Sequence, residues 1–313
     1  MGCVVFTVTS ETTVDWKETV RLLAETVAGH TPVEPARLRW TWENCFAEGA
    51  LIVSLRHEGA KVGQMVVLRH TLLVDGEPRP AGLVVDHIVL ARHRSREAVS
   101  VLASEAEARL RAHGIRYALG LRGARTRAHD AHHLALKTAA VLPLHLGLAF
   151  RAADPDVISW RVSDLETERL AALCARFATN SSEVGLPWSG PGLARRLSGP
   201  AVDYAVHLLP DVMAISSPRR AGGIPHTEIC AFLARDGATV ATDDLRRLVR
   251  AACRTWRRPL YAYCGLNRTL ERVPGLRLPR LVRPSPLVLR MRDFETPDLP
   301  ALDRYQSIDT DLA

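Results

Sequence analysis

The feature that most constrains the fold of this chain lies at residues 82–110, where an apolar segment, a basic turn and an amphipathic segment follow one another. The apolar segment covers residues 83–90 and is interrupted only by Asp86 and His87. The turn at residues 91–96 is rich in arginine. Behind it, apolar residues recur with the period of a helix, at Val99, Leu102, Ala106 and Leu110. The order predicts a strand, a cationic turn and a helix.

This turn would attract an anion for two reasons. The first N–H groups of a helix lack intrahelical partners, and the helix dipole places positive charge beside them. Arg92, Arg94 and Arg96 add side-chain charge at the same place. The pattern therefore predicts a phosphate-binding turn. The alternative for each arginine is an ordinary solvated surface residue.

The strand, the Arg-bearing turn and the helix resemble the GNAT (GCN5-related N-acetyltransferase) superfamily. In that superfamily, Gln/Arg-x-x-Gly-x-Gly/Ala at this place holds the pyrophosphate of acyl-coenzyme A. Arg94 matches the first motif position, whereas Glu97 and Val99 stand where the family has Gly and Gly/Ala. The phosphate-binding motif is therefore degenerate, because glycine allows a close backbone approach and a carboxylate at a helix start competes with a bound anion.

The same order of elements is predicted twice along the chain. The first half reads as a helix, a meander of three strands with a hairpin at Asp75-Gly76, the cationic turn, a helix and further strands. The predicted elements of the second half are a helix at 164–178, strands at 205–209, 212–216 and 227–233, a helix at 243–256, a strand at 260–264, a short helix at 267–273 and a strand at 287–291. Residues 180–200 are expected to form a loop, and residues 293–313 a polar surface tail.

This repeat resembles tandem GNAT proteins. It implies an α/β fold of two GNAT-like domains, at residues 1–155 and 156–313, each with a mixed, mostly antiparallel sheet flanked by helices. In each domain we expect two strands that splay apart, with residues 88–90 lining the splay of the first. We expect the donor in the first half, because the matching turn of the second offers only Arg235 beside Asp236.

Acyl transfer to an amine needs a group that removes a proton from the amine. The resemblance implies a carboxylate base on the strand before the turn, so Asp86 is the first candidate for catalysis and His87 the second. Alternation along a strand predicts that these two side chains lie on opposite faces. The alternative roles are a salt bridge of Asp86 to a local arginine and a half-buried histidine.

The resemblance also implies which residues hold the donor, acetyl-coenzyme A or a longer acyl-coenzyme A. Backbone groups of Ile88, Val89 and Leu90 would contact pantetheine. The turn and the helix start would contact the pyrophosphate, with Arg92, Arg94, Ser95, Arg96, Glu97 and Ala98 as the candidates.

Composition narrows the partners and the compartment. A net charge of +7, carried mostly by arginine, suits coenzyme A, a phosphopantetheinyl carrier protein or RNA, although an arginine-rich proteome gives the same bias. The six cysteines form no Cys-x-x-Cys pair, and the chain shows neither a signal-peptide pattern nor an apolar run of membrane length, so we expect a cytoplasmic protein. His129 and His133 stand at metal-ligand spacing without a third ligand, so we expect no metal.

The sequence thus predicts an N-acyltransferase that moves an acyl group from acyl-coenzyme A to an amine of a small-molecule acceptor. One alternative is a GNAT-fold enzyme whose donor is an acyl carrier protein or aminoacyl-tRNA. The other is a non-catalytic GNAT-like binding protein, which the degenerate turns of both halves favour. A homodimer is left open.

Overall fold

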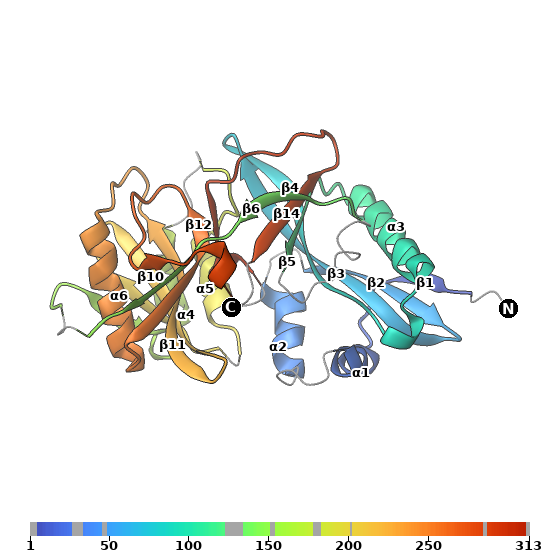
Figure 1. Ribbon diagram of the computed structural model, residues 1–313, viewed down its shortest axis with the longest axis horizontal. Coiled ribbons are helices and arrows are strands. Elements are labelled where there is room, and N and C mark those ends of the chain that lie inside the picture. The colour runs from blue at the N-terminus through green and yellow to red at the C-terminus, as the bar shows by residue number, and fades with distance from the viewer. Residues whose placement is uncertain are drawn as a thin grey trace. The chain divides into compact units, whose positions relative to one another are not determined.

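A computed structural model describes residues 5–26, 34–45, 49–122, 134–150, 154–177, 183–200, 202–283 and 287–310. The chain divides into two compact units (Figure 1). The first unit consists of Met1–Thr71, Arg79–Ala140 and Leu287–Leu299, and the second of Leu72–Pro78, Val141–Pro286 and Pro300–Ala313.

The first unit is built on a seven-stranded sheet with the order β1-β2-β3-β4-β5-β14-β6. Its strands are β1 (Thr7–Glu11), β2 (Ala50–His57), β3 (Ala60–Val74), β4 (Glu77–Val89), β5 (Tyr117–Arg122), β14 (Val288–Asp293) and β6 (Lys137–Val141). Its helices are α1 (Trp16–Thr26), α2 (Pro35–Trp40), the π-helical turn η1 (Thr41–Cys45), the 3-10 turn η2 (Ala91–His93) and α3 (Arg96–Ala112). β4 and β5 pair in parallel, whereas β5 and β14 pair antiparallel.

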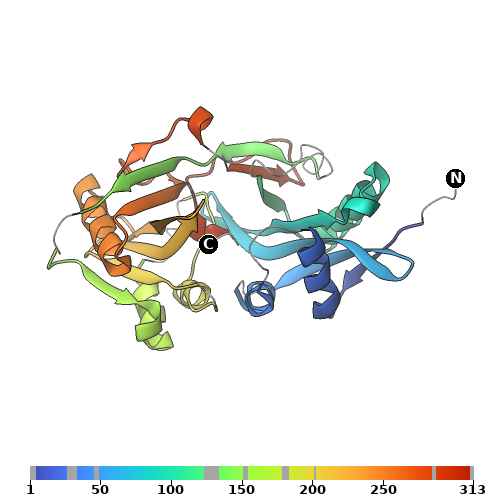
Figure 2. The ribbon, with the colours of Figure 1, turned by 60° about the horizontal axis from the view of Figure 1, so that its bottom comes forward.

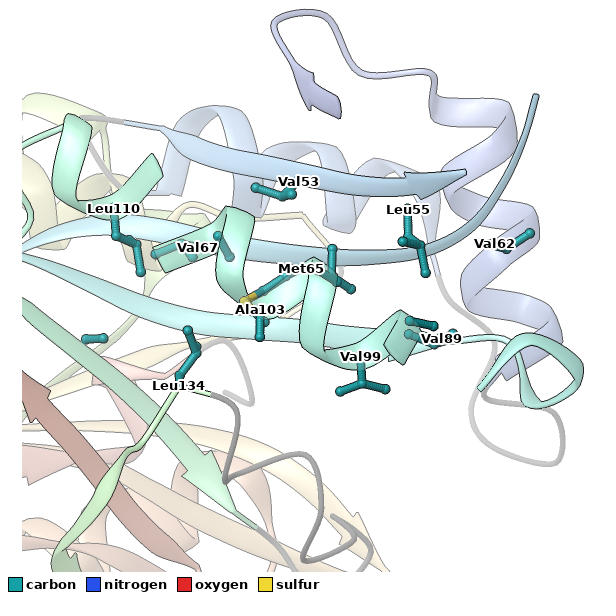
Figure 3. Packing of buried hydrophobic residues seen from close by; sticks show 14 of the residues in the cluster. Val53, Leu55, Val62, Met65, Val67, Val89, Val99, Ala103, Leu110 and Leu134 are labelled. Atoms are coloured by element: carbon teal, nitrogen blue, oxygen red, sulfur yellow. The ribbon is translucent and has the colours of Figure 1, made fainter. Parts of the chain in front are cut away.

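Helix α3 covers one face of this sheet, and α1 and α2 lie on the opposite face (Figure 2). The apolar face of α3 buries Val99, Leu102, Ala106 and Leu110, as the helical spacing predicts. These side chains pack with Met65, Val67 and other buried residues of the sheet (Figure 3). This packing fixes the start of α3 beside the end of β4.

The second unit repeats the plan on a sheet with the order β13-β7-β12-β11-β10-β9-β8, with β15 paired to β12. Its strands are β7 (Leu144–Leu148), β8 (Ile158–Arg161), β9 (Ala205–Leu208), β10 (Val212–Ala221), β11 (Ile224–Ala234), β12 (Leu260–Asn267), β13 (Leu276–Arg277) and β15 (Arg304–Gln306). Its helices are α4 (Thr167–Ala175), α5 (Gly190–Leu197) and α6 (Thr242–Trp256), with 3-10 turns η4 (Val162–Asp164), η5 (Arg280–Val282) and η6 (Ser307–Asp309). β11 and β12 form its parallel pair.

Each sheet takes one strand from the other half of the sequence. β7 follows β6 along the chain but pairs with β12 and β13, and β14 follows β13 but lies between β5 and β6. The boundary between the two compact units therefore lies between residues 140 and 141, and residues 287–299 belong to the first unit. This division differs from the expected ranges 1–155 and 156–313, because strand pairing rather than sequence order decides where β7 and β14 belong.

Several expected elements are confirmed, and the fold class is the expected one of two mixed, mostly antiparallel sheets flanked by helices. The Asp75-Gly76 hairpin is present with positive φ at both residues. Helices α1, α3 and α6 occupy the predicted places. Among the described helices, none combines the length and the apolar character that a membrane span requires.

Three expectations about the second unit are wrong. Residues 190–197 form helix α5 instead of a loop, because Ser189 caps the helix and Leu193 and Leu197 are buried beneath it. The short helix expected at 267–273 is absent from the described structure, since β12 continues to Asn267 and a turn follows. The polar tail lies on the surface only in part: residues 295–298 are exposed, whereas β15 and η6 are buried against the second sheet.

Candidate functional site

In the first unit, the parallel pairing of β4 and β5 stops before either strand ends. It runs from Ala81 opposite Tyr117 to Val84 opposite Gly120. β4 continues to Val89, while the last residues of β5 pair with β14. The expected splay of two parallel strands is therefore present, and the end of β4 from residue 85 onward lacks a β5 partner.

Asp86 lies in this unpaired part of β4 with a left-handed backbone, at a φ of 48°. Such a conformation is uncommon outside glycine and costs about 1–2 kcal/mol. It interrupts the regular strand geometry on which the alternation of Asp86 and His87 rests. Both side chains are partly exposed. A strained residue of this kind in a strand often marks a site where the chain positions a functional group.

The next residues, 88–90, are held by β3 and by the core. The Leu90 N–H donates to the carbonyl of Val62 on β3, at 2.9 Å. Ile88 lies close to Gly63, where a Cβ atom would stand 2.9 Å from the Ile88 carbonyl oxygen. Val89 and Leu90 are buried in the core beneath α3. The structure thus places the expected pantetheine-contacting residues at the splayed end of β4, in a rigid setting.

Arg94 turns back onto this strand. Its Nε and Nη2 atoms donate to the Val89 carbonyl at 3.3 and 2.9 Å. The side chain remains exposed. Its guanidinium group is therefore positioned at the junction of β4 and the turn. It occupies the Val89 carbonyl, which is one of the backbone groups expected to contact pantetheine.

Most N–H groups of the turn are used within the turn. His93, Arg94 and Ser95 donate to the carbonyls of Leu90, Ala91 and His93, at 2.9, 3.4 and 2.9 Å. A phosphate cradle of the glycine type needs such donors to point outward. The turn at residues 91–95 therefore offers few free backbone donors to a phosphate. This agrees with the absence of the motif glycines from the sequence.

Helix α3 begins with a side-chain cap. The Ser95 hydroxyl accepts from the Ala98 N–H at 3.1 Å, so this donor is also used. The first helical amides, those of Arg96 and Glu97, have no intrahelical acceptor by geometry. Both side chains are exposed. An anion at this helix start would meet two amides, the Arg96 guanidinium and, as an opposing charge, the Glu97 carboxylate.

The remaining arginine of the turn already has a partner. Arg92 forms a salt bridge of 3.1 Å with Glu25 of α1, in which both side chains are well exposed. His93 lies beside His57, with ring centroids 5.0 Å apart. Burial, followed by the electrostatic effect of the neighbouring His57 and Arg92, lowers the pKa of His93, so its ring is mostly neutral at pH 7. The turn is electropositive mainly through Arg94 and Arg96.

The other sequence candidates contribute less. Residues 123–133, with His129, His132 and His133, lie outside the described residues. Lys137 donates to the Pro297 carbonyl at 2.8 Å. Within the described ranges, no group of three or more His, Cys, Asp or Glu side chains could hold a metal ion. Sequence reasoning missed Gln306, because it lies in a segment that reads as a polar tail. In the structure, Gln306 accepts a hydrogen bond from Phe232 of β11 in the second unit.

A family model for an acetyltransferase (GNAT) domain matches residues 7–121, which cover β1 to β5 and include the whole strand, turn and helix just described. No curated protein matches the chain. Solved structures of other proteins share the fold at low sequence identity.

A GCN5-related N-acetyltransferase from Kribbella flavida is 13% identical, with a TM-score of 0.64, over 93% of this chain and 72% of that one. A tandem GNAT protein from the clavulanic acid biosynthesis pathway is 10% identical, with a TM-score of 0.59, over 92% and 98%. Saccharomyces cerevisiae N-myristoyltransferase with bound myristoyl-CoA is 11% identical, with a TM-score of 0.56, over 96% and 83%. These likenesses extend over both units.

Proposed function

We propose that this chain, whose residues 7–121 match an acetyltransferase (GNAT) domain and whose fold is similar to that of a tandem GNAT protein, transfers an acyl group from acyl-coenzyme A to the amine of a small-molecule acceptor. The observation that carries the proposal is the splayed end of β4 beside an arginine-bearing helix start, within the matched domain. One element can hold an extended thioester arm, and the other its diphosphate.

The proposed donor site uses side chains more than backbone. Arg94 and Arg96 would pair with the diphosphate, assisted by the first two amides of α3. The acyl-pantetheine arm would run along residues 88–90 of β4. We expect weaker binding than a glycine-rich turn provides, because three amides of the turn are used internally and Glu97 opposes the ligand charge.

Asp86 is the proposed base. Transfer requires that the acceptor amine lose a proton as its nitrogen attacks the thioester carbonyl, with the sulfur of the thiol as leaving group. A carboxylate at the splay, on a backbone held in a left-handed conformation, can take this proton directly or through a water. His87 is the second candidate, since its side chain is also partly exposed at the same place.

One observation favours a different acyl donor for an enzyme of this fold. A diphosphate needs several hydrogen-bond donors at once, whereas the phosphopantetheine arm of a carrier protein presents a single phosphodiester. The turn, with its internally bonded amides and two well-placed arginines, suits the smaller requirement. An acyl carrier protein is therefore the second candidate donor, and aminoacyl-tRNA is retained on the basic charge of the chain.

A thermal-shift titration tests the proposal most directly. Coenzyme A, acetyl-coenzyme A and longer acyl-coenzyme A thioesters should each raise the melting temperature, and release of free thiol in the presence of a panel of amines should identify the acceptor class. Acylated carrier protein is measured in parallel. If millimolar thioesters leave the melting temperature unchanged while the carrier protein raises it, the second candidate replaces the first.

A further inference from the structure

The second unit contains the same splay of parallel strands as the first, but its own C-terminal segment fills it. The parallel pairing of β11 and β12 ends at Ile229 opposite Tyr263, although β11 continues to Ala234. Beyond Tyr263, β12 pairs instead with β15, beginning with Gly265 opposite Gln306. Buried backbone groups of β11 need hydrogen-bond partners in this region, because β12 no longer supplies them.

The Gln306 side chain supplies these partners. The Phe232 N–H donates to Gln306 Oε1 at 2.9 Å, and Gln306 Nε2 donates to the Phe232 carbonyl at 3.2 Å. Tyr263 donates its hydroxyl to the same Oε1 at 3.1 Å, and Asn267 donates to the Phe232 carbonyl at 3.1 Å. Gln306 has no exposed surface. Its carboxamide thus bonds both backbone groups of one residue, as the amide of an extended ligand would.

The segment around Gln306 is firmly docked. The Gln306 N–H donates to Asp309 Oδ2 at 2.7 Å, and the Trp188 indole donates to Asp309 Oδ1 at 2.6 Å. Arg196 donates to the carbonyls of Ile308 and Thr310. Ile308 itself is fully buried. A segment held in this way is a permanent part of the second unit rather than a lid.

Close approach of this segment depends on glycine. A Cβ atom at Gly265 would stand 3.0 Å from the Cα of Gln306 and 3.1 Å from the Tyr305 carbonyl oxygen. On the other side, a Cβ at Gly185 would stand 2.9 Å from the Arg304 carbonyl oxygen. The neighbouring backbone is therefore shaped to admit β15.

The filled position corresponds to the candidate site of the first unit. Val84 and Ile229 are the last residues of the two parallel ladders, and His87 and Phe232 each follow three residues later. The helix that follows also differs. α6 has Ala241 as its N-cap without a side-chain cap bond and carries Asp243 and Asp244 in its first turn. Two carboxylates at a helix start oppose an anion.

We propose that the second unit is closed to acyl donors by the chain's own C-terminal segment, with the Gln306 carboxamide in the place of a ligand amide, so that each chain offers one donor site, in the first unit. The part that assigns a site to the first unit rests on the proposed function. The occupancy of the second unit rests only on the contacts of Gln306.

Hydrogen exchange tests the occupancy without any ligand. Gln306→Ala and the near-isosteric Gln306→Met remove the acceptor of the Phe232 N–H, so exchange of this amide in the full-length protein should become roughly tenfold faster. Ser307→Ala is the matched control, because it alters the neighbouring bond to Glu228 and leaves Gln306 in place. Circular dichroism shows which variants are folded, and the Met variant replaces the Ala variant if the latter is not. Unchanged exchange at Phe232 in a folded Gln306 variant would overturn the proposal.

Calorimetric titration with coenzyme A tests the number of donor sites. The wild-type chain should bind one equivalent, and Arg94→Ala with Arg96→Ala should lose it. Two equivalents in the wild type, or one equivalent that survives this double substitution, would overturn the closed second unit while leaving a donor-binding function intact. A wild type that binds no coenzyme A would count against the proposed function, and the exchange of Phe232 would then decide the occupancy by itself.

Discussion

At the scale of single residues, Asp86 carries the chemical part of the proposal. Asp86 lies on the part of β4 that has separated from β5, and its own backbone is left-handed. Replacement by asparagine keeps the shape and tolerates the left-handed backbone but cannot accept a proton. Asp86→Asn should therefore lower turnover by about 100-fold or more and change donor affinity little.

Steady-state kinetics with a saturating donor, together with a donor titration, check this prediction. His87→Gln is the companion variant at the adjacent position. If Asp86→Asn turns over at the wild-type rate and His87→Gln does not, the base is His87.

A second residue-scale prediction concerns acid stability. His207 is fully buried, with Ser159 Oγ 2.8 Å from Nδ1 and Ser216 Oγ 2.7 Å from Nε2, and burial lowers its pKa to about 3. The unfolded chain takes up this proton near pH 6.5, whereas the folded protein does so only near pH 3, so stability is present above pH 6.5 and falls as the pH is lowered through that window. We expect a loss of about 1.4 kcal/mol per pH unit from this group.

Urea unfolding at pH 7, 6 and 5 measures that slope. His207→Gln, which keeps hydrogen-bonding atoms at the same place, should flatten the slope by about one proton even if it is less stable throughout. His70, whose burial lowers its pKa to about 4, contributes a similar slope that the variant leaves in place. An unchanged slope in the variant would show that His207 titrates normally in the folded protein.

At the scale of elements, the strand, turn and helix at residues 77–112 are the proposed site of donor recognition. Arg94→Ala with Arg96→Ala should abolish the thermal shift caused by coenzyme A, because each charge-assisted contact to the diphosphate contributes about 1.5–3 kcal/mol. Arg109→Ala is the control, since it removes an exposed arginine from the far end of the same helix, where it pairs with Glu105. A shift that survives the double substitution would move the donor away from this helix start.

The same turn allows a change in the opposite direction. Glu97→Gly removes a carboxylate from the first turn of α3 and restores glycine at a position of the motif where the superfamily has it. Affinity for coenzyme A should rise several-fold, because a charge at a helix N-terminus is worth about 0.3–1 kcal/mol and the ligand gains a closer approach. Calorimetric titration gives the affinity, and weaker binding by the glycine variant would contradict the proposed place of the diphosphate.

The elements that sequence reasoning found are those whose signals are local. The helical spacing of Val99, Leu102 and Ala106 predicts α3, and Asp75-Gly76 predicts the hairpin, because periodicity and turn chemistry act within a few residues. The buried tail could not be found in this way. The partners of Gln306 are Phe232 and Tyr263, far away in sequence, and only the folded sheet brings them together.

At the scale of the whole molecule, the exchange of strands makes each sheet depend on both halves of the sequence. A chain that ends at residue 140 lacks β14, which separates β5 from β6 in the first sheet. We expect fragment 1–140 to aggregate or to melt without cooperativity, because the facing edges of β5 and β6 would lose their partner.

A fragment in which residues 287–299 are joined to residue 140 by a flexible linker restores that strand and should recover a cooperative transition. Size-exclusion chromatography and circular dichroism compare the two fragments. If fragment 1–140 is already monomeric and cooperative, the borrowed strand adds nothing to the stability of the first sheet.

The central claim is that the first unit holds the acyl donor between the splayed end of β4 and the start of α3. A crystal structure of the coenzyme A complex measures this directly. It should show the diphosphate beside Arg94 and Arg96, the pantetheine arm along residues 88–90, and Gln306 still bonded to Phe232 in the second unit. A nucleotide bound beside Gly237, at the turn between β11 and α6, would contradict the account.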